Sequence, residues 1–138
     1  MAKKEQQLQL QICNYLRIQY PKAIFFSEPS GLRVSIGQAV QLKKMRSFGK
    51  LPDIFVAYPN GKYHGLFMEL KVEGTTIFKK NGEMTSSEHI RAQFDTLTKL
   101  YELGYAAVFA VGFDDAKEKI DRYFALQSFA PTKDEKTS

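Results

Sequence analysis

The chain has 138 residues, of which 43% are hydrophobic, and a formal net charge of +5. This length supports one sizeable hydrophobic core, so we expect a single domain over residues 1–130 and a disordered polar tail over 131–138. The single cysteine, Cys13, excludes a disulfide framework within the chain and favours a reducing compartment. Cys13 lies within the apolar pattern of a predicted helix, so we expect it to be a small buried side chain. No apolar run is long enough to span a bilayer and no signal peptide is present, so we expect a cytoplasmic protein without membrane contact.

The first half of the chain alternates between helical patterns and short apolar runs. We predict a helix over 4–19 that ends before Pro21, a short strand over 23–26, a turn at 28–31 and a second helix over 35–48 that Gly49 closes. The residues expected to face the core are Leu8, Ile12, Tyr15 and Leu16 in the first helix and Ala39, Val40 and Leu42 in the second.

The second half of the chain begins with two apolar runs, 54–58 and 63–72, that flank Asn60-Gly61. Asn-Gly is a strong hairpin signal, so we predict an antiparallel pair followed by a polar loop over 73–85. A helix capped by Ser86 or Ser87 and ended by Gly104, a buried strand over 106–111 and a helix over 114–126 complete an α/β domain. The third helix has its apolar stripe at Ile90, Phe94, Leu97, Leu100 and Tyr101.

Two acidic residues and a lysine lie in this predicted hairpin. Side chains at i and i+2 of a strand point to the same face, so Glu69 and Lys71 project together while Leu70 points to the opposite face. Folding around Asn60-Gly61 puts position 53 opposite 68, which makes Asp53 a near neighbour of Glu69, and a single bulge would align the two carboxylates.

Two neighbouring carboxylates raise the pKa of one of them or repel each other unless a cation neutralises them. Oxygen ligands without Cys or His nearby favour Mg²⁺ or Mn²⁺. A lysine beside such a metal can hold the attacking water or offset charge on a phosphate, so Asp53, Glu69 and Lys71 predict phosphodiester hydrolysis. The alternative is a solvated cross-strand charge pair, but Glu69 and Lys71 interrupt a strongly apolar segment typical of a central strand.

Basic residues cluster on both sides of this pattern in the sequence. Each cluster alone is typical of a solvated face, but together they flank the candidate site and favour phosphate contacts with a polyanion. They are Lys43, Lys44, Arg46 and Lys50 before Asp53, and Lys79 and Lys80 after Lys71.

The order of the elements, with Pro52-Asp53 followed by Glu69-Leu70-Lys71, resembles the PD-(D/E)xK nuclease superfamily. In detail it is similar to the small stand-alone phage and bacterial members of the VRR-NUC family. Four stretches spread over nearly the whole chain carry the resemblance: Glu5-Gln6-Gln7-Leu8-Gln9, Gly49-Lys50-Leu51-Pro52-Asp53, Gly65-Leu66-Phe67-Met68-Glu69-Leu70-Lys71, and Gln93 with Leu97, Leu100, Gly104 and Tyr105. Gly49 lies one residue further from Pro52 than in the family's Gly-x-Pro-Asp.

The resemblance implies a restriction-endonuclease-like core, a central mixed sheet flanked by helices, in a bacterial or phage-infected cell. It implies a Mg²⁺- or Mn²⁺-dependent DNA endonuclease or exonuclease that prefers branched, flapped or four-way DNA, needs no small-molecule cofactor and pairs as a homodimer. Asp53, Glu69 and the main-chain carbonyl of Leu70 would hold the metal, with Glu5 completing its shell. Lys71 would orient or activate the attacking water, and Gln93 would hold Lys71 or the water.

Two other classes of function stay open. A catalytically inactive DNA-binding module would keep the fold and the basic residues, although such a module tends to lose a carboxylate or the lysine, and both remain here. A purely structural α/β interaction protein would explain the core but not the convergence of Asp53, Glu69 and Lys71. His64 and His89 are expected to be surface or packing residues.

Overall fold

The computed structural model describes residues 2–28, 34–47 and 49–125 of the chain. Parts of the predicted turn at 28–31, residues 48 and 126 of the predicted helices, and the predicted tail at 131–138 lie outside these residues. None of the described helices is long and apolar enough to cross a membrane. The elements in chain order are α1 (Ala2–Gln19), β1 (Ile24–Ser27), α2 (Ile36–Lys44), β2 (Ile54–Ala57), β3 (Leu66–Lys71), α3 (Glu88–Glu102), β4 (Ala106–Val111) and α4 (Gly112–Ala125).

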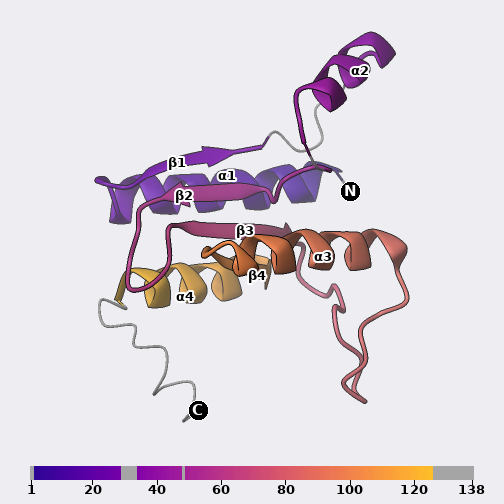
Figure 1. Cartoon of the computed structure of the whole chain (residues 1–138). Helices are drawn as coiled ribbons and strands as arrows, with labels where there is room; N and C mark the ends of the chain where they lie inside the picture. The colour runs from indigo at the N-terminus through magenta and orange to yellow at the C-terminus, as the bar shows by residue number, and fades with distance from the viewer. Residues whose placement is uncertain (1, 29–33, 48, 126–138) are drawn as a thin grey trace.

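The four strands form one mixed sheet in the order β1-β2-β3-β4. The first two pairings are antiparallel, and β4 lies parallel to β3. Helices α1 and α4 contact each other and β3, whereas α3 contacts β3 and β4 from the opposite face (Figure 1). The predicted α/β fold, a mixed sheet flanked by helices, is therefore confirmed.

The core lies between the sheet and the helix pair α1 and α4. Alternate residues of β3 point toward this pair, as the period of two in a strand requires. Its buried members come from α1, β2, β3, β4 and α4: Leu8, Ile12, Leu16, Ile54, Val56, Leu66, Met68, Leu70, Ala110, Ala116, Ile120 and Tyr123. The predicted inward stripe of the first helix is thus confirmed, and Cys13 is buried as predicted.

The β2–β3 hairpin forms, but its register is one residue away from the predicted one. Position 53 was expected opposite 68, whereas Ile54 pairs with Met68 and Asp53 is level with Glu69. The main chains of Asn60 and Tyr63 exchange two hydrogen bonds, so the turn has its tip one residue later than Asn60-Gly61. A turn closed by Asn60 and Tyr63 would by itself put Asp53 opposite residue 70, so the register shifts by one residue between this turn and the ladder, and this shift leaves Asp53 level with Glu69.

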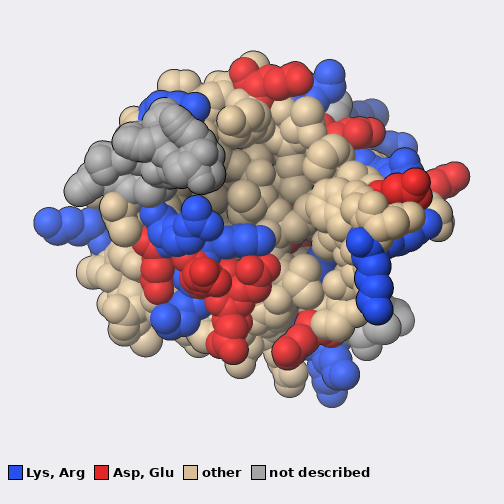
Figure 2. Space-filling model, turned by 90° about the horizontal axis from the view of Figure 1, so that it is seen from below, with Lys and Arg blue, Asp and Glu red and all other residues tan. Residues whose placement is uncertain are grey.

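The predicted buried strand over 106–111 is an edge strand, so this prediction was wrong in position. Only Ala110 of β4 is fully buried, and the rest of the strand is half-buried. Its outer edge is partly closed by α4, because Lys119 Nζ donates to the Phe109 carbonyl and the Val111 amide donates to Asp115. Figure 2, seen from below, shows a hollowed, uncharged area bordered by both basic and acidic side chains.

The second helix also differs from its prediction. It ends at Lys44, with Met45 as its C-cap, well before Gly49, and the side chains of Ala39, Val40 and Leu42 are exposed instead of inward. The helical pattern was correct, but it did not show whether the rest of the chain covers the helix. Figure 1 shows α2 standing beyond the end of β1, away from the other elements.

Gly104 ends α3 in a conformation that other residues rarely adopt. Its φ is +104°, and an added Cβ would lie 2.5 Å from Cδ2 of His64. We expect Gly104→Ala to lower the free energy of unfolding by about 1–3 kcal/mol, measured by urea denaturation. Gly37→Ala is the matched control, because its Cβ would meet nothing closer than 4.0 Å. Equal stability of the two variants would contradict the expectation.

Candidate active site

A cavity of about 260 Å³ lies at the end of the sheet where β3 ends and β2 begins. Its walls come from the start of α1, the segment before β2, the end of β3 and the first half of α3. All the residues predicted to be catalytic line it: Glu5, Asp53, Glu69, Lys71 and Gln93. Residues far apart in the sequence are therefore gathered around one space.

Asp53 and Glu69 are the two buried acids of this cavity. Asp53 directly precedes β2, and its Oδ2 accepts a hydrogen bond of 2.8 Å from the main-chain amide of Leu70. The Asp53 carboxylate thus accepts the hydrogen bond that a main-chain carbonyl would accept from Leu70 if the β2–β3 ladder continued. This bond fixes Asp53 beside the end of β3, next to Glu69.

Glu69 is held in an environment that disfavours its charge. Burial, the charge of Asp53 and a hydrogen bond between the two carboxyl groups, in this order of importance, raise the pKa of Glu69 to about 8. Lys71 and Lys50 act in the opposite direction but do not offset these effects. The two lysines therefore do not fully balance the negative charge of the paired carboxylates.

Gln93 connects α3 to this pair of acids. Its Nε2 donates a 2.7 Å hydrogen bond to Oε2 of Glu69, so the amide contacts Glu69 and no such bond joins it to Lys71. The amide oxygen, Oε1, is buried and has no hydrogen-bond partner among the described residues. Because buried acceptors are almost always satisfied, this oxygen calls for a donor bound in the cavity, such as water.

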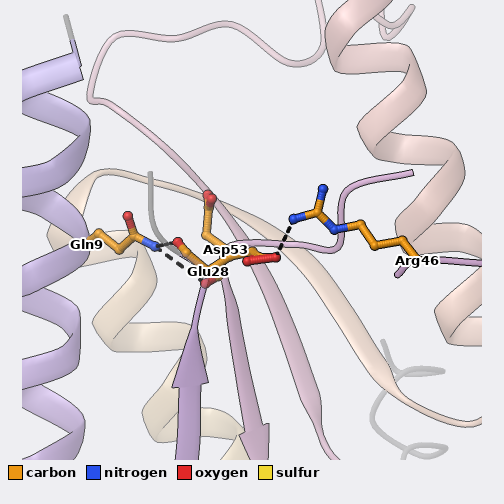
Figure 3. Close-up of polar contacts among 4 residues, drawn as sticks. All are labelled: Gln9, Glu28, Arg46 and Asp53. Atoms are coloured by element: carbon orange, nitrogen blue, oxygen red, sulfur yellow. Dashed lines mark hydrogen bonds and ion pairs between the residues drawn. The ribbon is translucent and has the colours of Figure 1, made fainter. Parts of the chain in front are cut away.

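Gln9 holds the opposite wall of the site in place (Figure 3). Its Nε2 lies 2.6 Å from Oγ of Ser27, 2.5 Å from the carbonyl oxygen of Glu28 and 3.5 Å from that of Asp53. One amide thus connects α1 to the end of β1 and the start of β2. The sequence signal for Gln9 is its position one helical turn after Glu5, within the first of the four stretches.

The predicted phosphate-binding residues are spread over four places. Lys50 lines the cavity, whereas Lys43 and Lys44 are exposed on α2. Arg46 pairs with the Glu28 carboxylate at 2.9 Å (Figure 3). Lys79 and Lys80 are exposed in the loop before α3. The face in Figure 2 carries both signs of charge, so it is not a continuous basic surface.

The metal-binding set that includes Glu5 is not assembled as a compact group. Among the described residues, no three His, Cys, Asp or Glu side chains are grouped so that they could hold a metal ion. Glu5 lines the cavity, but its side chain is exposed on the first turn of α1. Asp53 and Glu69 therefore form the acidic centre of the site without it.

Comparison with solved structures finds a protein that is similar to this chain over most of its length. A solved structure described as a VRR_NUC domain protein is 26% identical in sequence to this chain and superposes on it with a TM-score of 0.65. The match covers 89% of this chain and 89% of the other chain. No family sequence model matches the chain, and the comparison with curated proteins finds no match. The chain therefore has a VRR-NUC-like fold of the PD-(D/E)xK type.

Proposed function

We propose that this protein is a metal-dependent nuclease that hydrolyses phosphodiester bonds of DNA. The observation that carries the proposal is the pair of buried carboxylates, Asp53 and Glu69, which share a cavity with Lys71 and the unsatisfied amide oxygen of Gln93. A structural protein has no use for a buried acid whose pKa is raised to about 8. The VRR-NUC-like fold supports the same conclusion.

The residues present fit a divalent cation. The donors at hand are the carboxylates of Asp53 and Glu69 and the main-chain carbonyl of Leu70, which are hard oxygen ligands of the kind Mg²⁺ and Mn²⁺ prefer. The raised pKa of Glu69 marks the charge deficit that such a cation would remove. When bound, the cation would polarise the phosphate and lower the pKa of a coordinated water.

The chain's own side chains supply the remaining functions. Lys71 points to the same face of β3 as Glu69, so its ammonium group can orient a water or offset the negative charge that builds up on the phosphate. Gln93 fixes Glu69 through Nε2, and its free Oε1 can accept a hydrogen bond from the attacking water. Glu5 can contact a bound water from the opposite wall.

The class of substrate that we propose rests on the positive charge of the protein and on contacts to phosphate groups. The net charge of +5 and the position of Lys50 at the cavity favour a polyanion held by its phosphates. The contacts proposed here are to phosphates, which carry no base sequence, so we expect recognition of branched, flapped or four-way DNA by shape. Lys43, Lys44, Lys79 and Lys80 remain proposed phosphate contacts, and pairing of two copies remains part of the proposal.

The purified protein is expected to cut DNA in Mg²⁺ or Mn²⁺ and not in EDTA, because nothing else in the cavity can neutralise two carboxylates and a phosphate together. A panel of end-labelled duplex, nicked, flapped and four-way DNAs, resolved on denaturing gels, measures both metal dependence and substrate preference. Binding of these DNAs without cleavage in either metal would favour the inactive DNA-binding module instead. Absence of any binding at low salt would favour a structural protein.

A further inference from the structure

A groove runs along the outer edge of β4, between α3 and α4. It consists of two adjoining hollows, of about 430 and about 200 Å³, which share Tyr101, Ala107, Val108 and Lys119 in their walls. Seen from below, where α4 and the loop between β3 and α3 lie in Figure 1, the surface is hollowed and uncharged in its middle (Figure 2). The groove is distinct from the acidic cavity, because no described residue lines both.

Exposed aromatic rings line this groove. Phe78 is 52% exposed, Tyr101 is 53% exposed and Phe94 is 37% exposed. Phe78 and Phe94 lie edge to face with their ring centroids 6.3 Å apart, and Phe109 of β4 adds a half-buried ring. Single exposed apolar side chains are common on protein surfaces, but several rings along one hollow indicate a binding surface.

The loop between β3 and α3 presents Phe78 from a small hairpin. Phe78 forms an antiparallel bridge with Met84, and the Lys79 amide donates a 2.7 Å hydrogen bond to the Glu83 carbonyl. Lys79 and Lys80, the loop lysines, directly follow Phe78 and are exposed. The hairpin therefore presents an aromatic ring and two ammonium groups from neighbouring positions.

The charge of the groove is positive where it carries any. Among the described residues, its charged lining consists of Lys119 and Arg122, both on α4. Lys119 pairs with Asp115 at 3.2 Å, whereas Arg122 is exposed. Aromatic rings with cations beside them are the usual surface for unpaired strands of nucleic acid, because bases stack on the rings and phosphates contact the cations.

The groove begins one strand away from the acidic cavity. Phe109 of β4 is level with Glu69 of β3, and neighbouring strands of a sheet lie about 4.8 Å apart. On α3, Gln93 contacts Glu69, while the next residue, Phe94, lies about 100° further around the helix and lines the groove. A DNA strand that leaves the duplex at the cavity can therefore enter the groove directly.

We propose that this groove binds an unpaired strand of DNA by stacking its bases on the exposed rings of Phe78, Phe94 and Tyr101. Phosphates of the same strand then lie near Arg122 and the loop lysines. The inference rests on the proposed nuclease function and makes its substrate more specific: flapped DNA, whose branch is single-stranded, is preferred over blunt duplex and four-way DNA. Every base has a face that can stack, so the groove selects unpaired strands without reading their sequence.

A peptide strand added to the edge of β4 is the other occupant that such a groove could take. Strand addition uses the main-chain groups of the edge strand. Here Lys119 Nζ donates to the Phe109 carbonyl at 2.7 Å, and the Val111 amide donates to the Asp115 carboxylate at 2.9 Å. These two side chains occupy positions that a peptide would need, whereas base stacking needs only the rings.

Binding is measured by fluorescence anisotropy in EDTA at low salt, so its outcome does not depend on cleavage. The probes are a labelled oligothymidine of about 12 nucleotides and an abasic oligomer of the same length, which keeps the phosphates but has no bases. The unchanged chain should bind the oligothymidine at least about tenfold more tightly than the abasic oligomer. The double variant Phe78→Ala/Tyr101→Ala should lose about tenfold in affinity for the oligothymidine and keep its affinity for the abasic oligomer.

Matched variants separate stacking from loss of apolar volume. Phe78→Leu keeps an apolar side chain without a ring and should weaken oligothymidine binding as Phe78→Ala does, whereas Phe78→Tyr and Tyr101→Phe keep the ring and the affinity. Phe26→Ala removes a similarly exposed ring (62%) of β1 outside the groove and should bind like the unchanged chain. All these variants should keep their circular dichroism spectrum, because the side chains are exposed.

Cleavage in Mg²⁺ separates this inference from the proposed function. The ratio of flap cleavage to duplex cleavage should fall about tenfold in Phe78→Ala/Tyr101→Ala. A variant that cuts both DNAs at the unchanged ratio would refute the groove and leave the nuclease function intact. Base-dependent binding that the variant loses, in a chain that cuts no DNA, would support the groove and refute the nuclease function.

Three results of the binding experiment would overturn the proposal. The first is equal affinity of the unchanged chain for the oligothymidine and the abasic oligomer. The second is unchanged oligothymidine affinity in Phe78→Ala/Tyr101→Ala, which would leave the groove to a protein partner. The third is a double variant whose mass by light scattering differs from that of the unchanged chain, which would assign the groove to a contact between copies.

Discussion

Asp53→Asn is expected to lower the single-turnover rate of DNA cleavage by at least about 10³-fold in Mg²⁺. Asparagine has the same size, and its amide oxygen can still accept the 2.8 Å hydrogen bond from the Leu70 amide, so the end of the β2–β3 ladder is preserved. What disappears is the negative charge that would hold the cation beside Glu69. The loss should therefore be chemical, with an unchanged circular dichroism spectrum.

Two companion variants sharpen this test. Asp95→Asn removes an exposed carboxylate of α3 that does not line the cavity, and it should cut DNA at the rate of the unchanged chain. Lys71→Ala should lower the rate by on the order of 10²–10⁴-fold while retaining DNA binding, because Lys71 acts on the developing charge. Cleavage at full rate by Asp53→Asn would rule out a metal site at this position.

Glu69→Gln is expected to abolish cleavage and, in EDTA, to stabilise the protein. The folded-state pKa of Glu69 is about 8 against an ordinary value of 4.5, so its contribution to stability is complete below pH 4.5 and is lost as the pH rises to about 8. Each pKa unit corresponds to about 1.4 kcal/mol, so the loss amounts to several kcal/mol. Glutamine carries no such penalty and can still accept the hydrogen bond from Gln93.

Urea denaturation in EDTA from pH 5 to pH 8.5 measures this difference. The unchanged chain should lose stability relative to Glu69→Gln as the pH rises, and Mg²⁺ should restore it in the unchanged chain only. Glu102→Gln, an exposed position on the same helix as Gln93, should leave the pH dependence as it is. If stability changed with pH in the same way in the unchanged chain and in Glu69→Gln, folding would not raise the pKa of Glu69.

Local patterns predicted much of the fold and part of the site. The apolar stripe of α1, the serine cap and glycine end of α3, and the shared face of Glu69 and Lys71 all follow from periods of 3.6 and 2 residues. These features depend on neighbours a few positions away in the chain. Together with the family resemblance, the sequence therefore named Glu5, Asp53, Glu69, Lys71 and Gln93, which all line the cavity, but it did not assign Gln9 or His89 to it.

The contacts between these residues depended on longer-range packing. The turn at Asn60–Tyr63 and the one-residue shift in register between this turn and the strands together put Asp53 level with Glu69. The packing of α3 on the sheet brings Gln93 within hydrogen-bond distance of Glu69. The path of the chain after β1 brings Arg46 into an ion pair with Glu28. None of these partners is separated by a fixed helical or strand period, so no local pattern could choose between them.

Burial of whole elements was also decided only by the tertiary structure. The apolar run over 106–111 is compatible with either a central strand or an edge strand. In the structure it pairs only with β3, in parallel, and is therefore the edge strand of the described sheet. The pattern of α2 likewise identified a helix with an apolar side but not what covers that side. The sequence by itself determined the elements and the chemical groups of the site; the tertiary structure decided their partners, because burial depends on which distant surfaces meet.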